Sequence, residues 1–297
     1  MQTVDEVEEI ETTKGVSRLS EIFGLIRRNK GALVGGLMIL VFLGISLAQA
    51  IATGLGVRIT PYDPLQLTSL LHSPPNWAHL LGTDNFGRDV LSRVITALPN
   101  DAEISFAVIA VALVVGTLIG TFAAFRGGIL EEALMRATDV FFAIPALILA
   151  IAIAVALGNG LLNINLALMI IWWPAYARLA RGEALKVSHQ NFIEASRLAG
   201  YGTVKIVFGH VIPNIFLTMI VYATLDIGTV VLVYSGISYF GIGVQPPHPE
   251  LGNMVSLNVD YILVYPWLPL IPGLIIALLV VSYSIFGDGL RDALEAG

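Results

Sequence analysis

The stretch NFIEASRLAGYGTVKIVFGHVIPN occupies residues 191–214 and separates two long apolar runs. It carries Glu194, Arg197 and Lys205, and its residues keep a helical period. If the apolar runs on either side cross a lipid bilayer, a polar segment between them must lie in water on one side of the membrane. The sequence therefore indicates a helical membrane protein with a water-facing segment suited to docking.

Within this stretch the sequence predicts one short surface helix. Gly200 stands where a left-handed residue ends a helix, and Ser188 is the predicted N-cap. Two interpretations fit: a docking helix followed by glycine hinges, or a surface helix packed on its own bundle. Apolar and small residues at helical spacing form one stripe: Phe192, Ala195, Ser196 and Ala199.

The composition places most of the chain in lipid. Of its 297 residues, 56% are hydrophobic and only 13% are charged, against about 25% charged in soluble domains. A helix needs roughly 20 apolar residues to cross the hydrocarbon core. We therefore predict an all-α integral membrane protein with six spans, of which the fourth is the weakest. The predicted spans are 32–53, 103–125, 138–158, 163–180, 207–235 and 266–287.

The basic residues orient these predicted spans. With the N-terminus inside, only Arg58, Arg88 and Arg93 of the 16 Lys and Arg residues fall outside. The positive-inside rule favours this orientation over the reverse one. We therefore expect a multi-pass protein of the cell membrane with both termini in the cytoplasm.

The predicted organisation has four parts. Residues 1–30 form an acidic cytoplasmic tail, and residues 31–102 hold the first transmembrane helix and an extracellular segment. Residues 103–290 form the core membrane domain, which includes a cytoplasmic loop at 181–206. Residues 291–297 form a short cytoplasmic tail, which leaves no room for a soluble catalytic domain.

Two local features are expected in the extracellular segment. Asp84 and Asp89 belong to a run similar to a calcium loop, but the distal glutamate of such a loop is missing. We therefore expect these carboxylates to cap the helix that follows. That helix should be short and amphipathic and lie on the outer membrane interface, with one apolar face made of Val90, Leu91, Val94 and Ile95.

Several classes of site are excluded by what the sequence lacks. The absence of cysteine excludes disulfides, thiolate metal sites and cysteine nucleophiles. There is no G-x-x-x-x-G-K-[ST] motif, so the chain lacks a phosphate-cradling loop of its own. The five histidines show no metal-ligand spacing. We therefore expect no catalytic residue and no metal site.

Polar groups inside the spans are candidates for a pathway. An ionised carboxylate at Asp226 costs at least ~2.5–3.5 kcal/mol within a membrane helix, so it must face water or the bundle interior. We predict that Asp226 lines a pathway, and a hydrogen-bonded internal role is the alternative. Further candidates for the lining are Thr218, Tyr222 and Thr224.

Other residues are expected to serve helix contacts. Asp139 should pair with Arg136 or with a helix end. Two pairs of glycines four residues apart, in 31–35 and 116–120, suit close approach of helices. Such pairs are common in membrane helices and carry little functional weight.

The motifs along the chain resemble those of one family. Glu194-Ala195-Ser196, three residues and Gly200, followed by Ile212-Pro213, resemble the EAA loop of permease subunits in ATP-binding-cassette importers. The chain departs from the family's pattern at three places. Ser196 stands where the motif has its second alanine, and Ile212 stands where leucine commonly precedes the motif's proline. Residues 295–297 replace the family's usual acidic-proline ending. From roughly Leu70 to Leu294 the chain is similar to the C-type permeases of dipeptide and oligopeptide importers. The motifs are HLLGTDNFGRDVLSR (79–93), RGG (126–128), RATD through AIP (136–145), YARLAR (176–181), FGIGVQPP (240–247) and GDGLRDAL (287–294).

The resemblance implies a type I, MetI-like permease fold within a heteromeric importer. The implied partners are a homologous second permease, two ATP-binding cassette ATPase subunits and an extracellular substrate-binding protein. ATP and magnesium would be bound by the ATPases, so this chain would hold no cofactor, have no enzyme activity and bind no nucleic acid. Phe192 would fill a pocket of the ATPase, and Glu194 and Arg197 would pair with its charges. The implied coupling residues are Phe192, Glu194, Ala195, Ser196, Arg197 and Gly200.

The same residues argue against two rival functions. A secondary transporter using Asp226 and Asp139 as ion sites needs paired broken helices from an inverted repeat, which the sequence does not show. An intramembrane enzyme needs a catalytic pair in the spans, and none is recognisable. Peptide is the default substrate implied by the resemblance, with oligosaccharide and nickel as alternatives.

Overall fold

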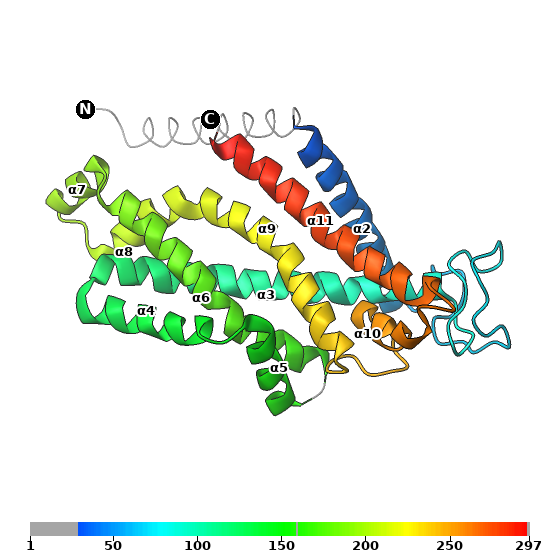
Figure 1. Ribbon diagram of the computed structural model, residues 1–297. Helices are drawn as coiled ribbons and strands as arrows, with labels where there is room; N and C mark the ends of the chain where they lie inside the picture. Colours follow the sequence, from blue (N-terminus) through cyan, green and yellow to red (C-terminus); the bar gives the residue numbers. More distant parts are fainter. Residues whose placement is uncertain (1–28, 159, 296–297) are drawn as a thin grey trace.

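The computed structural model describes residues 29–158 and 160–295, and the regular secondary structure of these residues is helical apart from one isolated β-bridge (Figure 1). Apart from Asn29 and Lys30, the predicted tail at 1–30 lies outside them. Within the described ranges, the β-type pairing is an isolated bridge between Thr83 and Asp89. The elements are α2 Lys30–Gly54, α3 Val90–Arg126, α4 Gly128–Phe142, α5 Ala146–Leu157, α6 Leu161–Ser188, α7 Asn191–Leu198, α8 Thr203–Ile206, the π-helical turn η1 Val207–Val211, α9 Ile212–Tyr239, α10 Leu251–Ser256, the 3-10 turn η2 Val259–Tyr261 and α11 Trp267–Glu295.

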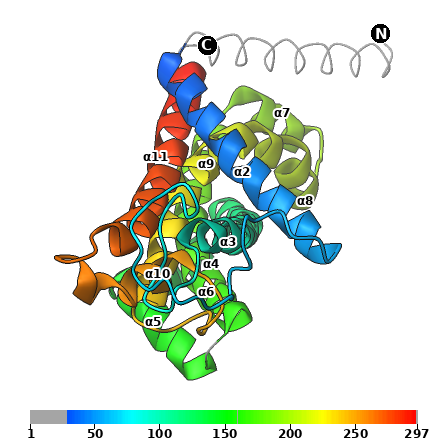
Figure 2. The ribbon, with the colours of Figure 1, turned by 90° about the vertical axis from the view of Figure 1, so that its right-hand side faces the viewer.

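The first and last long helices, α2 and α11, pack against each other (Figure 1), and they diverge away from the start of α2 (Figure 2). Glycine makes this contact close. A Cβ atom at Gly35 would stand 2.8 Å from the Ser282 carbonyl oxygen and from the Phe286 nitrogen. The glycine pair at 31–35 therefore serves helix packing, as its spacing predicts.

The centre of the bundle is the pair α3 and α6. A Cβ at Gly116 would stand 2.4 Å from the Tyr176 Cβ, and one at Gly120 would stand 2.1 Å from the Ala177 carbonyl oxygen. Both glycines thus allow the backbones to approach closely. The second glycine pair also serves helix packing, and around it gathers a buried apolar cluster that includes Ile104, Val108, Leu168 and Ala180.

The expected short interfacial helix at 90–95 is wrong. These residues are the first turns of α3, which runs unbroken for 37 residues through Pro99. Val90 and Val94 are buried against Leu251 and Leu268. The apolar face is therefore covered by protein rather than by the membrane interface, and the helix continues into the bundle.

The predicted third span at 138–158 is not one straight helix. It is divided between α4 and α5, which meet at an angle of 90°. Proline disfavours the helical region for the residue before it. Pro145 has ψ 129°, outside the helical region. The break therefore falls between Phe142, the last residue of α4, and Ala146, the first residue of α5.

The described helices include four that could each cross a membrane. Among the described helices, α2, α3, the continuous run Thr203–Tyr239 and α11 are long and apolar enough to cross a membrane, and the bent pair α4–α5 makes a fifth at most. The fourth predicted span lies in α6, which has 28 residues. Asn163, Asn165 and the Trp172-Trp173-Pro174 sequence lower its apolar character.

The run Thr203–Tyr239 contains a π-helical turn, η1, between α8 and α9. Its signature is the Ile212 N–H, which donates to the Val207 carbonyl, five residues back. Pro213 has no N–H to return to the preceding turn. The Asn214 side-chain amide donates to the His210 carbonyl oxygen at 2.6 Å. Pro213 thus lacks a backbone donor, and the Asn214 side chain supplies a donor to the preceding turn instead. Both features favour the wide π-helical turn over a regular α-helix.

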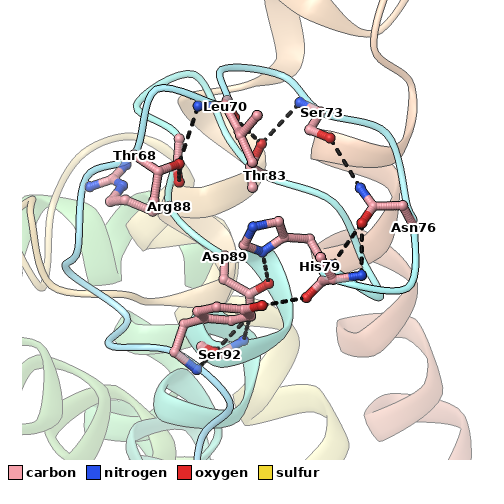
Figure 3. A network of polar contacts seen from close by, with 12 residues as sticks. Thr68, Leu70, Ser73, Asn76, His79, Thr83, Arg88, Asp89 and Ser92 are labelled. Atoms are coloured by element: carbon pink, nitrogen blue, oxygen red, sulfur yellow. Dashed lines mark hydrogen bonds and ion pairs between the residues drawn. The ribbon is translucent and has the colours of Figure 1, made fainter.

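The segment 55–89, drawn in cyan, lies at the opposite end of the molecule from α7 (Figure 1). We call this end, which also carries α10, the loop end. Its polar side chains bond to one another (Figure 3). The Asp89 carboxylate accepts from the Ser92 N–H at 2.8 Å and lies 2.8 Å from the His79 Nδ1. Asp89 therefore caps α3, as predicted from the sequence. The same prediction for Asp84 is wrong, because its carboxylate accepts from the Phe86 and Arg88 N–H groups of the preceding loop.

Two cations at the loop end are held internally. Arg88 Nε donates to the Asp84 carboxylate at 2.7 Å. Arg93 is only 2% exposed and its Nη1 donates to the carbonyls of Pro64 at 3.0 Å and Pro247 at 3.2 Å. Arg93 thus ties both the segment 55–89 and the loop before α10 to α3.

Candidate functional site

The surface helix predicted between Ser188 and Gly200 is present as α7, which is eight residues long. Its predicted N-cap is wrong: Ser188 belongs to α6, where its hydroxyl donates to the Leu185 carbonyl at 2.8 Å. Gln190 takes the extended N-cap position instead and makes no side-chain cap bond. Because serine can satisfy its hydroxyl on the preceding turn, its presence does not fix where a helix starts.

The predicted end of α7 at Gly200 is confirmed. Gly200 has φ +82° in the left-handed region. The Tyr201 N–H donates to the Ser196 carbonyl at 3.1 Å, and the Gly200 N–H donates to the Arg197 carbonyl at 3.0 Å. This pair of bonds is a Schellman motif, which closes the helix and turns the chain toward α8.

One residue anchors α7 to the body of the protein. Ile193 is completely buried in the same apolar cluster as Ala180 and Val211. Ile193 lies outside the stripe identified from the sequence, so this anchor was missed. The available signal was a large aliphatic residue in a helix that also carries Glu194 and Arg197. The predicted stripe lies away from the anchor: Phe192, Ala195 and Ala199 are exposed and Ser196 is half-buried.

Five of the six predicted coupling residues are exposed in α7 or directly after it, and one further exposed residue was not predicted. Glu194, Ala195, Arg197 and Gly200 are exposed, as is Phe192. Leu198, which was not singled out, is 85% exposed, so this face has an apolar projection beside its charges.

Ring contacts hold the surroundings of α7 in place. The His210 ring lies between Phe192 and Tyr201, at 6.3 Å from each ring centroid. The Lys205 ammonium stands 3.7 Å from the Tyr201 ring centroid. Arg197 was expected to face a partner's charges; here its guanidinium lies 5.6 Å from the Phe125 ring at the end of α3. These contacts join α7 to α3 and to η1.

A cavity of about 510 Å³ opens between α6, α9 and α11. Of the four candidates for a pathway lining, Thr218 and Tyr222 lie on its wall, whereas Thr224 and Asp226 do not. The Thr224 hydroxyl donates to the Ile220 carbonyl at 2.9 Å. The remaining wall is partly charged. It consists of Leu179, Glu183, Lys186, Val221, Leu225, Arg291 and Leu294.

Asp226 directly follows Leu225, which lines this cavity. The Asp226 side chain itself is bound to a neighbouring helix. Its carboxylate accepts a hydrogen bond from the Trp172 Nε1 at 2.5 Å. Trp172 is buried on α6, so the bond joins α9 to α6. Tyr222, one turn earlier, packs its ring edge-on against Tyr176 with centroids 5.1 Å apart.

The expected pairing of Asp139 with Arg136 is wrong. Asp139 pairs with Arg178 of α6, and Arg178 Nε also donates to the Thr138 hydroxyl at 2.9 Å. Arg136 instead lies 3.5 Å from Glu132 on its own helix. Arg178 reaches Asp139 because α4 and α6 are adjacent, which the sequence spacing alone does not reveal.

Comparison with known proteins places this arrangement in a family. Residues 116–297 match the family model described as "Binding-protein-dependent transport system inner membrane component". The chain belongs to this family. It is an inner-membrane permease component of a binding-protein-dependent ATP-binding-cassette importer.

Curated relatives extend the similarity of this permease to nearly its full length. It is 38% identical over 286 residues to the di/tripeptide transport system permease protein DppC of Pseudomonas aeruginosa, covering 94% of this chain and 92% of the relative. It is 35% identical over 284 residues to the dipeptide permease DppC of Haemophilus influenzae, covering 93% and 94%. A glutathione transport system permease, GsiD of Pectobacterium atrosepticum, is 32% identical over 271 residues, covering 90% and 87%.

A solved structure supports the fold of this permease. A chain of the inward-facing MetNI methionine transporter matches with a TM-score of 0.54 and 19% sequence identity. The match covers 69% of this permease and 96% of the other chain. This similarity confirms the predicted MetI-like fold.

Proposed function

We propose that this permease forms half of the passage for di- and oligopeptides in an ATP-driven importer. The observation that carries the proposal is α7: a short helix, anchored by Ile193 and closed by Gly200, that leaves a mixed apolar and charged face uncovered. The peptide assignment rests on the named substrates of the relatives. An oligosaccharide or nickel passage is the alternative for the same role.

The proposal assigns the driving force to other subunits. ATPase subunits would receive Phe192 and Leu198 in an apolar pocket and contact Glu194 and Arg197 at its rim. ATP and magnesium would be bound there, a second permease would complete the passage, and a substrate-binding protein outside the cell would deliver the peptide. The buried side chain of Ile193 supports this role, because a force applied to α7 would be transmitted through it to the apolar core.

The test is purification of the full chain with an affinity tag from its native membrane. Two ATPase subunits and a second homologous permease should be recovered with it. After reconstitution into vesicles with the binding protein, dipeptide uptake should require ATP. Uptake that follows an ion gradient without ATP would show a secondary transporter and refute the proposal.

The proposed topology has six spans with both termini in the cytoplasm, and the distribution of basic residues supports it. Because the chain has no cysteine, single cysteines can report the side of the membrane. A membrane-impermeant thiol reagent should label Gln190→Cys only from the cytoplasm and Ala78→Cys only from outside. Both positions are exposed. Labelling of the two from the same side would contradict this topology.

Asp226 is proposed to act on the passage together with Thr218, Tyr222 and Thr224. In Asp226→Asn the shape is kept but the negative charge is lost. Uptake of peptides with a free amino group should fall relative to N-acetylated peptides, because the variant no longer has the negative charge that attracts the peptide's ammonium group. Trp172→Phe removes the 2.5 Å bond without changing the charge and serves as the control. An unchanged substrate ratio in Asp226→Asn would assign the carboxylate to helix packing alone.

A further inference from the structure

One helix of the bundle leaves much of its surface without a partner. Of the 15 residues of α4, only Thr138 is buried. One side of α4 packs on α3 and α6 (Figure 1), and its other side is open in the part of the chain that the structure describes. An open helix surface of a membrane protein faces lipid, another protein or water, and its residue types decide which of these fits.

The open side of α4 carries charges. Glu132, Arg136 and Asp139 stand at i, i+4 and i+7, so they follow one line along the helix. The side chains of Arg136 and Glu132 are 74% and 68% exposed, and the Arg136 Nη2 lies 3.5 Å from the Glu132 Oε1. We call these three residues, together with Arg178 of α6, the charged stripe.

Arg178 fixes the position of the charged stripe in the bundle. Its guanidinium pairs with Asp139, donates to the Thr138 hydroxyl at 2.9 Å and lies 4.3 Å from the Phe142 ring centroid. The Arg178 and Asp139 side chains are still 41% and 53% exposed. The charged stripe therefore consists of two ion pairs that are open on one side and have no net charge.

The charged stripe lies beside the apolar part of α3 and not beyond its end. Residues 104–125 carry no charged side chain and extend over about 33 Å, close to the thickness of the hydrocarbon core. Only Gly127 separates α3 from α4, which runs back along α3 (Figure 1). A Cβ atom at Gly120 would stand 2.1 Å from the Ala177 carbonyl oxygen, so Arg178 is level with Gly120, about 9 Å before the end of α3.

Charges at this depth exclude lipid as the neighbour of the open side. Ionisable residues in membrane-spanning segments are costly in lipid and almost always face the bundle interior or a water-filled cavity. A tightly packed protein neighbour would have to bury four charges, which is costly unless each is well hydrogen-bonded. At 3.5 Å, Glu132 and Arg136 do not meet that condition, so water is the neighbour that fits.

We propose, on the basis of the proposed function, that the charged stripe lines the cytoplasmic half of the passage and contacts the charged groups of peptides. Charges of alternating sign can interact in turn with the ammonium and the carboxylate of a peptide. Because the charged stripe has no net charge, it holds neither group firmly. Glu132 and Arg136, which are the most exposed members, then set how well peptides with charged side chains are carried.

Two opposite charge changes test this role. Arg136→Gln leaves the charged stripe with a net negative charge, and Glu132→Gln leaves it with a net positive charge. We expect the ratio of uptake of a lysine-containing dipeptide to that of a glutamate-containing one to rise several-fold in Arg136→Gln and to fall several-fold in Glu132→Gln. Uptake is measured in proteoliposomes that hold the full complex, with the same binding protein throughout.

The control for these variants is Arg126→Gln. It removes a positive charge at the end of α3, outside the charged stripe, and should keep the wild-type ratio. Any result other than opposite shifts in Arg136→Gln and Glu132→Gln would overturn the proposal.

Water access to the open side is tested with two single cysteines in this cysteine-free chain. Ala137 on α4 and Val114 on α3 are both exposed, and each lies about 15–18 Å from the junction of the two helices. While the complex turns over with ATP, Ala137→Cys should react with a charged, membrane-impermeant thiol reagent added on the cytoplasmic side. Val114→Cys should stay unreactive, because the reacting thiolate needs water. Excess dipeptide should slow the reaction of Ala137→Cys.

The labelling also separates this proposal from the proposed function. An unreactive Ala137→Cys would show that α4 faces lipid or a packed subunit, and a reaction that dipeptide does not slow would place it on a surface outside the passage. Either result would refute the charged stripe as a wall of the passage even if the complex carries peptides. A wild-type complex that carries no peptide would refute the proposed function, whereas labelling of Ala137→Cys and not of Val114→Cys would still report a water-filled wall.

Discussion

Gly120→Val is expected to prevent the permease from accumulating in the membrane. The new Cβ would stand 2.1 Å from the Ala177 carbonyl oxygen and 2.8 Å from the Arg181 nitrogen, both backbone atoms of α6. Backbone atoms cannot rotate away as a side chain can, so α3 and α6 would have to separate. Overpacking costs typically about 1–3 kcal/mol, and separation of the central pair should place this variant at or above that range. The amount of permease in membranes, measured by immunoblot, should fall several-fold.

A matched control for this prediction is available in α2. Gly44 also lies inside a helix, but no atom stands within 4 Å of its added Cβ. Gly44→Val therefore carries the same intrinsic helix change without the clash, and its membrane level should stay near that of the wild type. Equal levels of the Gly120 and Gly44 variants would show that close approach of α3 and α6 is not needed for the fold.

Gly200→Val is expected to abolish ATP-driven uptake while leaving the complex assembled. With φ +82°, position 200 lies in the left-handed region, which costs an ordinary residue about 1–2 kcal/mol and a β-branched one more. No atom stands within 4 Å of an added Cβ there, so the effect comes from the backbone alone. The Schellman motif should open and α7 should lose its fixed direction. Peptide uptake and substrate-stimulated ATP hydrolysis in proteoliposomes measure the loss.

The control for this second variant lies two residues away. Gly202 has φ −70° and also has no atom within 4 Å of an added Cβ. Gly202→Val therefore changes the same loop without left-handed strain and should keep most of the uptake. Normal uptake in Gly200→Val would reject α7 as the coupling element. Loss of uptake in both Gly200→Val and Gly202→Val would show that added side-chain volume in the loop, and not left-handed strain, causes the defect.

The sequence predicted features governed by local patterns. Apolar runs indicated the membrane helices, Asp89 was predicted to cap α3, and Gly200 was predicted to end α7 because only a left-handed residue fits there. Glycine pairs also marked the close contacts of α2 with α11 and of α3 with α6. Each of these signals lies within a few residues, so no knowledge of distant contacts was needed.

Features that depend on distant contacts were missed or mistaken. Residues 90–95 have the pattern of an interfacial helix, and only their burial against Leu251 and Leu268 shows that they continue into α3. Asp139 finds Arg178 because α4 folds alongside α6.

The unbroken course of α3 has a mechanical consequence. Its 37 residues make a rod about 55 Å long at 1.5 Å per residue. Near one end, Phe125 lies beneath Arg197 of α7; near the other, Arg93 holds the carbonyls of Pro64 and Pro247. The helix has no loop between these contacts, so the proposed coupling helix α7 and the loop end are joined by a single secondary-structure element.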